Sequence, residues 1–145
     1  MQGPGFVAIR YEMVHETRVI PLDSRPRLGK DLRFDIGSAH GHWEGDTLVV
    51  ETTNFKQRSA YRNANADTLR LVERFLRTSA DRVEWSVTVE DRSTWAQPWT
   101  FAMPLTRNDD EAVELYECHE GNHAIFNILS AARAAEREQA ASQSR

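Results

Sequence analysis

The sequence predicts a mainly β fold, an antiparallel barrel or sandwich followed by a C-terminal α-helix. Apolar and polar side chains alternate over residues 83–90 with the two-residue period of a strand that has one buried face. Turn residues separate this segment from its neighbours by only a few positions, and connections that short join antiparallel strands. Over residues 125–132 the apolar spacing changes to three and four, which is typical of an amphipathic helix.

In the N-terminal half, β-branched and aromatic residues predict two strands that end near Pro21 and Pro26. A loop is expected over residues 27–41, and a hairpin follows in which Gly45 supplies the positive φ of a tight turn. Residues 54–67 are polar and contain three Asn, which predicts a long loop of the kind that often forms a lid or a binding loop. The strands expected in this half cover residues 6–13, 14–22, 42–43 and 47–53.

In the C-terminal half, three apolar faces predict three strands separated by short turns, and a further strand is expected before Gly121. Gly121 and Asn122 break the strand pattern, and the apolar stripe that follows predicts a helix packed on the sheet. The polar tail from Glu136 onwards is expected to fray. The expected elements are strands at residues 69–75, 83–90, 101–105 and 112–120, a helix over about 122–138, and a tail to 145.

The composition fits one globular domain over residues 1–145. A chain of 145 residues has the usual length of a single domain, and 40% hydrophobic with 28% charged residues is ordinary for one. The net charge of −4 comes from acidic and basic residues mixed along the chain, which leaves no basic face for nucleic acid. The one cysteine, Cys118, cannot form an intrachain disulfide and does not indicate a redox compartment.

Neither a membrane span nor an export signal is expected. No apolar run approaches the roughly 20 residues that cross a bilayer. The opening residues, Met1–Gly5, lack the basic and apolar regions of a signal peptide. We therefore expect a soluble chain, and its compartment stays open.

The first candidate site is the segment His40–Asp46. His40, His42 and Glu44 alternate, so in an extended chain their side chains leave on one face. Imidazoles and a carboxylate on one face can bind a divalent metal such as zinc or copper, or act as a general acid–base pair. The alternative is a surface turn in which Asp46 caps its own backbone and both histidines are solvated.

The second candidate site is the segment Cys118–His123, at the junction of the last expected strand and the helix. His119 is a candidate general base with Glu120 as its orienting partner, and Asn122 is a candidate ligand contact beside a helix N-terminus that favours anions. The alternative is that Glu120 and Asn122 cap the helix while His119 packs. Cys118 is interpreted as a buried inert thiol, because neighbours in a strand point to opposite faces.

Four further residues are candidates with a structural alternative. Glu73 shares an apolar face with Leu69, Leu71 and Phe75, so it is expected to be paired, with Arg18, Arg25 or Arg74 as possible partners, or else to be catalytic. His15 is a candidate third metal ligand, although a histidine beside a strand is more often simply hydrogen-bonded. Trp95 and Trp99 flank a bend at Pro98 and are candidates for a pocket wall or a sugar platform, with core packing as the alternative.

Four stretches of the chain resemble a large family of uncharacterised bacterial proteins that are abundant in soil acidobacteria and environmental samples. They are residues 19–23, 98–100, 116–122 and the specific stretch GHWEGDTLVVETTNF at 41–55. Members of that family are usually longer, with a signal peptide and an extra N-terminal segment, so this chain resembles their C-terminal portion or a natural short form. The resemblance implies an exported ancestor and no established activity. Members commonly carry a basic residue at the position of His40 and a Tyr at that of His123, which favours His42, Glu44, His119 and Glu120.

These observations lead to one main functional hypothesis and two alternatives. The main hypothesis is a hydrolase or lyase for a small polar metabolite. In it His119 is the general base, Glu120 or Glu44 is its acid or orienting partner, and His42 is an electrophile or metal ligand. The first alternative is a non-catalytic module that holds a small molecule or sugar, as the mouth of a lipocalin-like barrel or the end of a sandwich can. The second is a structural oligomerisation domain. We also expect a homodimer, because missing N-terminal strands would leave a sheet edge or an apolar patch open.

Overall fold

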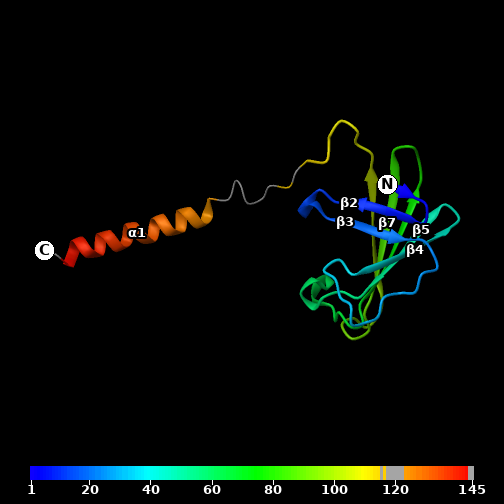
Figure 1. Ribbon diagram of the computed structural model, residues 1–145, viewed down its shortest axis with the longest axis horizontal. Helices are drawn as coiled ribbons and strands as arrows, with labels where there is room; N and C mark the ends of the chain where they lie inside the picture. Colours follow the sequence, from blue (N-terminus) through cyan, green and yellow to red (C-terminus); the bar gives the residue numbers. More distant parts are fainter. Residues whose placement is uncertain (115, 117–122, 144–145) are drawn as a thin grey trace.

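Two antiparallel sheets make up the body of the protein in the computed structural model, which describes residues 1–114, 116 and 123–143 (Figure 1). The small sheet has the strand order β1-β2-β3 and the large sheet the order β4-β5-β6-β7-β8. The mainly β, antiparallel prediction is confirmed, and the described strands form a sandwich-like pair of sheets without closing into a barrel. The bounds are β1 Gln2–Gly3, β2 Phe6–Arg10, β3 Thr17–Pro21, β4 Ser38–Glu44, β5 Thr47–Thr53, β6 Arg70–Arg77, β7 Arg82–Glu90, β8 Trp99–Thr106 and α1 Ala124–Gln143.

The large sheet owes its two unlike faces to the alternation seen in the sequence. Because paired residues in neighbouring strands share a face, Val50 of β5, Glu73 of β6 and Val87 of β7 form one row on the inner face. The outer face carries ion pairs from Arg70 to Glu51 and Glu90. The inner face therefore receives the small sheet, and the outer face remains polar.

The small sheet packs on the inner face through a cluster around Ile20, Leu48 and Val50, all buried. Val7 and Ile9 of β2 join this cluster, and the strands of the small sheet cross those of the large sheet steeply in Figure 1. A second buried cluster lies around Val87, Val89 and the loop that follows β5. A three-stranded sheet covers only part of a five-stranded one, so the far end of β8 stays open and its Met103 and Leu105 are exposed.

Gly41 permits the close approach of the small sheet to β4. A Cβ atom at this position would lie 2.8 Å from Cγ2 of Ile20 and 2.9 Å from Cδ2 of Leu22, closer than real Cβ contacts allow. Both neighbours come from the small sheet or its continuation, and Ile20 is completely buried. The absence of a side chain at Gly41 therefore sets the spacing between the sheets. The predicted positive φ of Gly45, at 59°, is also confirmed in the β4–β5 turn.

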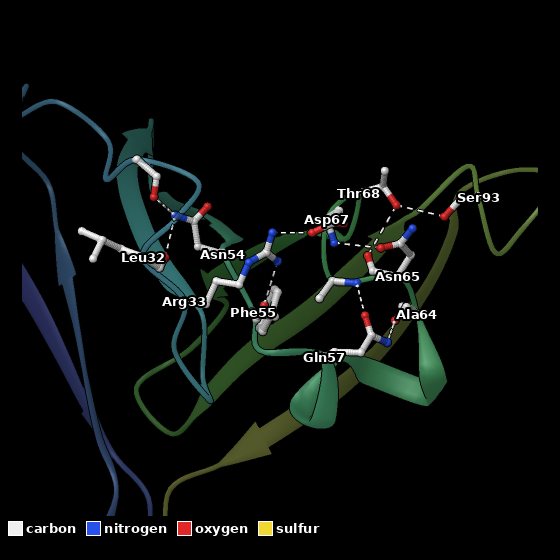
Figure 2. A network of polar contacts seen from close by, with 12 residues as sticks. Leu32, Arg33, Asn54, Phe55, Gln57, Ala64, Asn65, Asp67, Thr68 and Ser93 are labelled. Atoms are coloured by element: carbon white, nitrogen blue, oxygen red, sulfur yellow. Dashed lines mark hydrogen bonds and ion pairs between the residues drawn. The ribbon is translucent and has the colours of Figure 1, made fainter.

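The long loop predicted after β5 is present, and side-chain hydrogen bonds hold it against the large sheet (Figure 2). The Gln57 side chain bridges Ala64 and Ala66, donating to the carbonyl of the first at 2.9 Å and accepting from the amide of the second at 3.0 Å. The Asn54 amide donates to three carbonyls of the preceding loop, those of Leu28, Gly29 and Leu32. Ala64 and Ala66 are buried, so this loop is part of the core.

Asp91, which directly follows β7, anchors the same loop. Its side chain accepts hydrogen bonds from the hydroxyls of Thr68, Ser93 and Thr94 and from the backbone amide of Asn65. Burial alone would raise the pKa of Asp91, but these hydrogen bonds outweigh it and hold the pKa well below its usual range. Asp91 is therefore ionised and structural.

Several strand boundaries differ from the predicted ones, among them those of β2 and β4. The strand predicted over residues 6–13 ends at Arg10, because the chain turns through a short connection before β3. β4 begins at Ser38, inside the loop predicted over 27–41, since residues 38–41 pair with β5. The extra length places His40 in a strand rather than a loop.

The predicted C-terminal region needs larger corrections. Residues 112–114 and 116 do not belong to the strand predicted over 112–120, and several acidic residues in 109–114 favour contact with water. The helix begins at Ala124 and extends to Gln143, so the tail predicted to fray is largely helical; its residues are good helix formers without Gly or Pro.

The prediction that α1 packs on the sheet is wrong. Figure 1 shows α1 standing away from the sheets, and its apolar residues, including Ile125, Ile128 and Leu129, are exposed. The outer sheet face carries ion pairs, such as those of Arg70 and Arg74. In the part of the chain that the structure describes, α1 and the other helical segments fall short of the apolar length needed to cross a bilayer.

Replacing Gly41 with Ala tests the spacing between the sheets. We expect Gly41→Ala to lower the free energy of unfolding by about 1–3 kcal/mol, because the added methyl group overpacks the contact with Ile20. Gly29→Ala is the matched control: a Cβ there has no neighbour within 4 Å, so its effect should stay within about 0.5 kcal/mol. Chemical denaturation measures both, and equal effects of the two variants would contradict this account of Gly41.

Candidate ligand-binding site

A groove opens between β2 and the ends of β6, β7 and β8, where the small sheet stops short of covering the inner face. Its volume is about 760 Å³, within the range of about 300–1,000 Å³ that small-molecule sites occupy. The strand positions that line it are largely apolar, because they continue the inner faces of both sheets. Apolar lining residues are Val7, Ile9, Leu48, Phe75, Val83 and Leu105.

Arginines line the rim of the groove. Arg10 is the last residue of β2, Arg77 the last of β6 and Arg82 the first of β7, while Arg107 directly follows β8. Asp81 is the one acidic residue that also lines the groove. The strand topology brings these arginines together. β6 and β8 end where β7 begins, so arginines at these strand ends lie at the same end of the large sheet.

The four arginines differ in how far their guanidinium groups are already engaged. Arg77 donates to the carbonyls of Ser79 and Ala80, both at 3.0 Å, and so closes the β6–β7 turn. Arg107 forms a two-point ion pair with Asp109, and this hydrogen-bonded partner raises the pKa of Arg107. Arg82 lies 3.5 Å from Glu84.

Arg10 differs from the other three arginines. Its side chain has no hydrogen bond or ion pair with any residue that the structure describes, and it is exposed at the end of β2. By strand alternation, the side chain of Arg10 leaves β2 on the face opposite to that of Ile9, and the side chain of Arg82 leaves β7 on the outer face with Glu84. Their guanidinium groups therefore do not converge on the groove.

A buried ion pair lies behind the groove floor. Arg18 is 7% exposed and Glu73 4% exposed, and the guanidinium of the first donates to the carboxylate of the second. Arg18 also donates to the hydroxyl of Thr52. Its paired residue in the neighbouring strand β2 is Ile9, which lines the floor of the groove. The expectation that Glu73 is held by a buried cation is confirmed, with Arg18 as the partner.

The Arg18–Glu73 pair crosses from one sheet to the other. Burial disfavours the charge of Arg18, but the hydrogen bond and the negative charge of Glu73 outweigh this effect, so the pKa of Arg18 is raised. The Nε atom of Arg18 is buried without a partner among the described residues. The carboxylate of Glu73 is thus committed to holding the sheets together, two residues from Phe75 in the groove.

Aromatic side chains form a continuous row along the inner face from the groove to the other end of the large sheet. Phe75 stacks on Trp85 with ring centroids 6.1 Å apart, and Trp85 meets Phe101 edge to face at 5.9 Å. Phe101 contacts Trp99, which in turn packs edge to face with Trp95 at 5.7 Å. Trp95 and Trp99, the predicted pocket wall, therefore lie at the end of the row far from the groove and pack beside the second core cluster.

The first histidine segment forms an exposed charged cluster on the outer face. The Nε2 atom of His42 lies 3.1 Å from Glu44, and Arg74 donates to the same carboxylate at 2.7 Å. The hydrogen bond from Arg74, followed by that from His42, lowers the pKa of Glu44. Glu44 is therefore suited to orienting His42 and poorly suited to donating a proton.

The other described histidines are engaged elsewhere. His40 donates from Nε2 to the carbonyl of Asp23 at 2.8 Å, which ties β4 to the loop before it. His15 lies in the β2–β3 connection and accepts a hydrogen bond from the backbone amide of Tyr116. Since the small sheet packs on the inner face, His15 and His42 lie on opposite sides of the large sheet.

The second histidine segment cannot be placed. Cys118, His119, Glu120 and Asn122 lie outside the described residues. Among the residues that are described, no three His, Cys, Asp or Glu side chains gather as a metal-binding group. Among the described residues, His42 is therefore not joined by the other described metal candidate, His15.

Sequence reasoning did not single out the groove arginines. Arg10, Arg77, Arg82 and Arg107 are far apart in the chain, and only the strand register brings them to one edge. A usable signal was present: an arginine lies within two residues of an end of three predicted strands, at positions that an antiparallel meander places side by side. Histidine and carboxylate motifs drew attention to the outer face instead.

No family model, curated protein or solved structure matches the chain. The candidate site is thus defined by the chain's own residues: an apolar floor, an arginine rim and a buried ion pair behind them.

A double-mutant cycle tests the role of the Arg18–Glu73 pair. We expect Glu73→Gln to reduce the free energy of unfolding by about 3–5 kcal/mol, because it leaves the buried Arg18 charge uncompensated. The double variant Arg18→Met with Glu73→Leu should recover most of that loss, since it removes both charges and keeps apolar volume. Urea denaturation measures each variant. A double variant no more stable than Glu73→Gln would show that the pair does not stabilise the structure as a unit.

Proposed function

We propose that this protein is a non-catalytic binding module that holds a small, partly apolar molecule in the groove between its sheets. The observation that carries the proposal is the combination of a groove of about 760 Å³ with an apolar floor made by both sheets. Recessed apolar sites with a few polar groups at the mouth are the usual form of small-molecule sites. The groove floor also has rigid support, because β2 is paired with the strand that carries Arg18, and Arg18 is fixed to Glu73.

The hydrolase or lyase hypothesis stays a prediction for the second histidine segment. Its proposed base, His119, and partner, Glu120, lie outside the described residues. Its described members, His42 and Glu44, form an exposed pair with Arg74 on the face opposite the groove. The binding module is favoured because its proposed site rests on described residues of both sheets.

A second candidate function, self-association as a homodimer, is supported by α1. Ile125, Ile128 and Leu129 share one helix face and are 72%, 67% and 53% exposed. Contiguous apolar surface of this kind is a usual mark of an interaction site. Pairing of α1 with a second copy would bury this stripe, and it would leave the groove free.

A polar substitution in the groove tests the binding function. The neutral fluorescent probe N-phenyl-1-naphthylamine should bind saturably, and Leu105→Gln should weaken its binding about tenfold, or about 1.4 kcal/mol. Leu76→Gln is the matched control, because Leu76 is 40% exposed where Leu105 is 41% exposed, and it lies outside the groove. Equal losses in the two variants, or no saturable binding by the parent protein, would reject the groove as the site.

Substitution of the α1 stripe tests self-association and controls for probe binding to the helix. We expect a dimer at micromolar concentration by size-exclusion chromatography with light scattering, and a monomer for Ile128→Asp with Leu129→Asp. Charges on an apolar contact surface oppose its burial. Asn127→Asp changes charge at a polar helix position and should leave the dimer intact. A monomeric parent protein would refute self-association, and unchanged probe binding by the monomer would keep the groove as the binding site.

A further inference from the structure

We infer that a second pocket, at the hairpin end of the small sheet, binds a small uncharged molecule through a carbonyl oxygen that accepts a hydrogen bond from Arg18. This pocket is separate from the groove and has a volume of about 340 Å³. It contains a buried cation beside apolar walls, and this combination indicates the class of the ligand. The lining residues are Tyr11, Met13, Val14, Glu16, Arg18 and Ile36.

The strand register places the polar groups of this pocket on one face of the small sheet. Ile9 pairs with Arg18, whose side chain points toward Glu73 of the large sheet. Two residues further along, the backbone amide of Tyr11 continues the ladder by donating to the carbonyl of Glu16 at 2.8 Å. By alternation, the side chains of Tyr11 and Glu16 leave on the same side as that of Arg18. All three therefore face into the pocket that they line.

The guanidinium of Arg18 has hydrogen-bonding capacity that the described residues leave unused. A guanidinium carries five N–H groups, and those on Nη2 donate to Thr52 at 2.5 Å and to Glu73. The Nε atom has no partner among the described residues, and the phenol of Tyr11 is a further hydrogen-bonding neighbour of the guanidinium. Arg18 is more than nine-tenths buried, and a buried donor without an acceptor is costly. A ligand oxygen in the pocket would supply an acceptor.

The charges around the pocket favour an uncharged ligand. Glu73 already compensates the positive charge of Arg18, and Glu16 adds a second carboxylate to the pocket lining. A carboxylate ligand would meet two negative charges, and an ammonium group would meet the guanidinium. A neutral carbonyl oxygen avoids both conflicts, and a hydrogen bond from a charged donor is a strong one.

The remaining walls suit a compact apolar group. Met13, Val14 and Ile36 give the pocket hydrocarbon and thioether surface, and Tyr11 adds an aromatic ring. Met13 and Val14 are exposed at the hairpin tip and Ile36 is half-buried, so a molecule can enter from water. A small amide or ketone with an apolar body matches the walls and the donor together, and benzamide represents this class.

NMR of the methionine methyl groups tests the pocket on the whole chain, because the three methionines lie in different places. Met13 lines this pocket, Met1 lines the groove, and Met103 belongs to β8 and lines neither. Protein labelled with ¹³C in the methionine methyls and with ¹⁵N throughout is titrated at neutral pH with benzamide, benzoate and toluene. These three molecules share a ring and differ in charge and in the acceptor that they offer.

We expect benzamide to shift the Met13 methyl and the Arg18 Nε–H resonances saturably. For a ligand of so few atoms the dissociation constant should be on the order of 1 mM. Toluene offers no acceptor, and benzoate brings a negative charge beside Glu16 and Glu73. Each should bind about fivefold to tenfold more weakly than benzamide.

The double variant Arg18→Met with Glu73→Leu tests the guanidinium as the donor. It removes the donor together with its counter-charge and keeps apolar volume, so it is expected to fold. It should bind toluene at least as well as the parent protein does and should lose the preference for benzamide over toluene. Thermal unfolding verifies that the variant is folded.

Val14→Asn tests the apolar wall and leaves the buried pair intact. Val14 has a φ of 64°, which Asn adopts more readily than Val, so this variant is also expected to fold. Binding of benzamide and of toluene should weaken alike, about threefold to fivefold, because apolar contact is lost. Val113→Asn is the matched control, since Val113 is exposed and lies outside the pocket, and it should change neither.

The possible outcomes separate this pocket from the groove. Equal binding of benzamide and toluene by the parent protein would overturn the role of Arg18, and tighter binding of benzoate would overturn the uncharged ligand. Shifts at Met1 without shifts at Met13 would overturn the pocket and favour the groove. No shift at Met13 with any of the three molecules would also overturn the pocket, while titration with N-phenyl-1-naphthylamine decides the groove independently. A benzamide preference that the double variant loses and Val113→Asn keeps would support the inference.

Discussion

A buried guanidinium and a buried carboxylate, Arg18 and Glu73, join the two sheets at the centre of the inner face. Glu73 stands in a row with Val50 and Val87, where an unpaired carboxylate would be strongly unfavourable. Arg18 reaches it from the small sheet, so the pair fixes which part of the large sheet is covered. The uncovered part, between β2 and the ends of β6–β8, is the groove. The position of the candidate site is thus a consequence of one cross-sheet contact.

The two faces of the large sheet divide the chemistry of the molecule. The outer face carries exposed ion pairs, among them Arg74–Glu44, and such pairs contribute little to stability in water. The inner face carries the apolar clusters, the aromatic row and the buried pair. A small molecule that avoids water finds its contacts on the inner side, and arginines at the strand ends give that side a charged entrance.

Much of the fold follows from local patterns, because strand alternation and turn residues act over short distances. The period-two pattern of β7, the Gly45 turn and the loop after β5 are present, and the pairing expected for Glu73 is confirmed. The predicted packing of α1 on the sheet was wrong. An apolar stripe on a helix indicates that this face is to be buried, but it does not indicate which surface covers it. The groove could not be predicted, because Arg10, Arg82 and Leu105 meet only through register and through the way one sheet crosses the other. Histidine density indicated His42 and His119, but density along a chain does not show which sheet face a residue occupies.

The central claim is that ligands enter between the sheets at the end marked by Arg10 and Leu105. A titration of ¹⁵N-labelled protein with the neutral probe, followed by two-dimensional NMR, tests it most directly because each backbone amide reports its own surroundings. The account predicts shifts confined to residues 1, 7–10, 48, 75–83 and 105–107, the parts of the chain that line the groove. Shifts centred on His42 and Glu44, or on Trp95 and Trp99, would contradict it and move the site to the outer face or to the far end of the aromatic row.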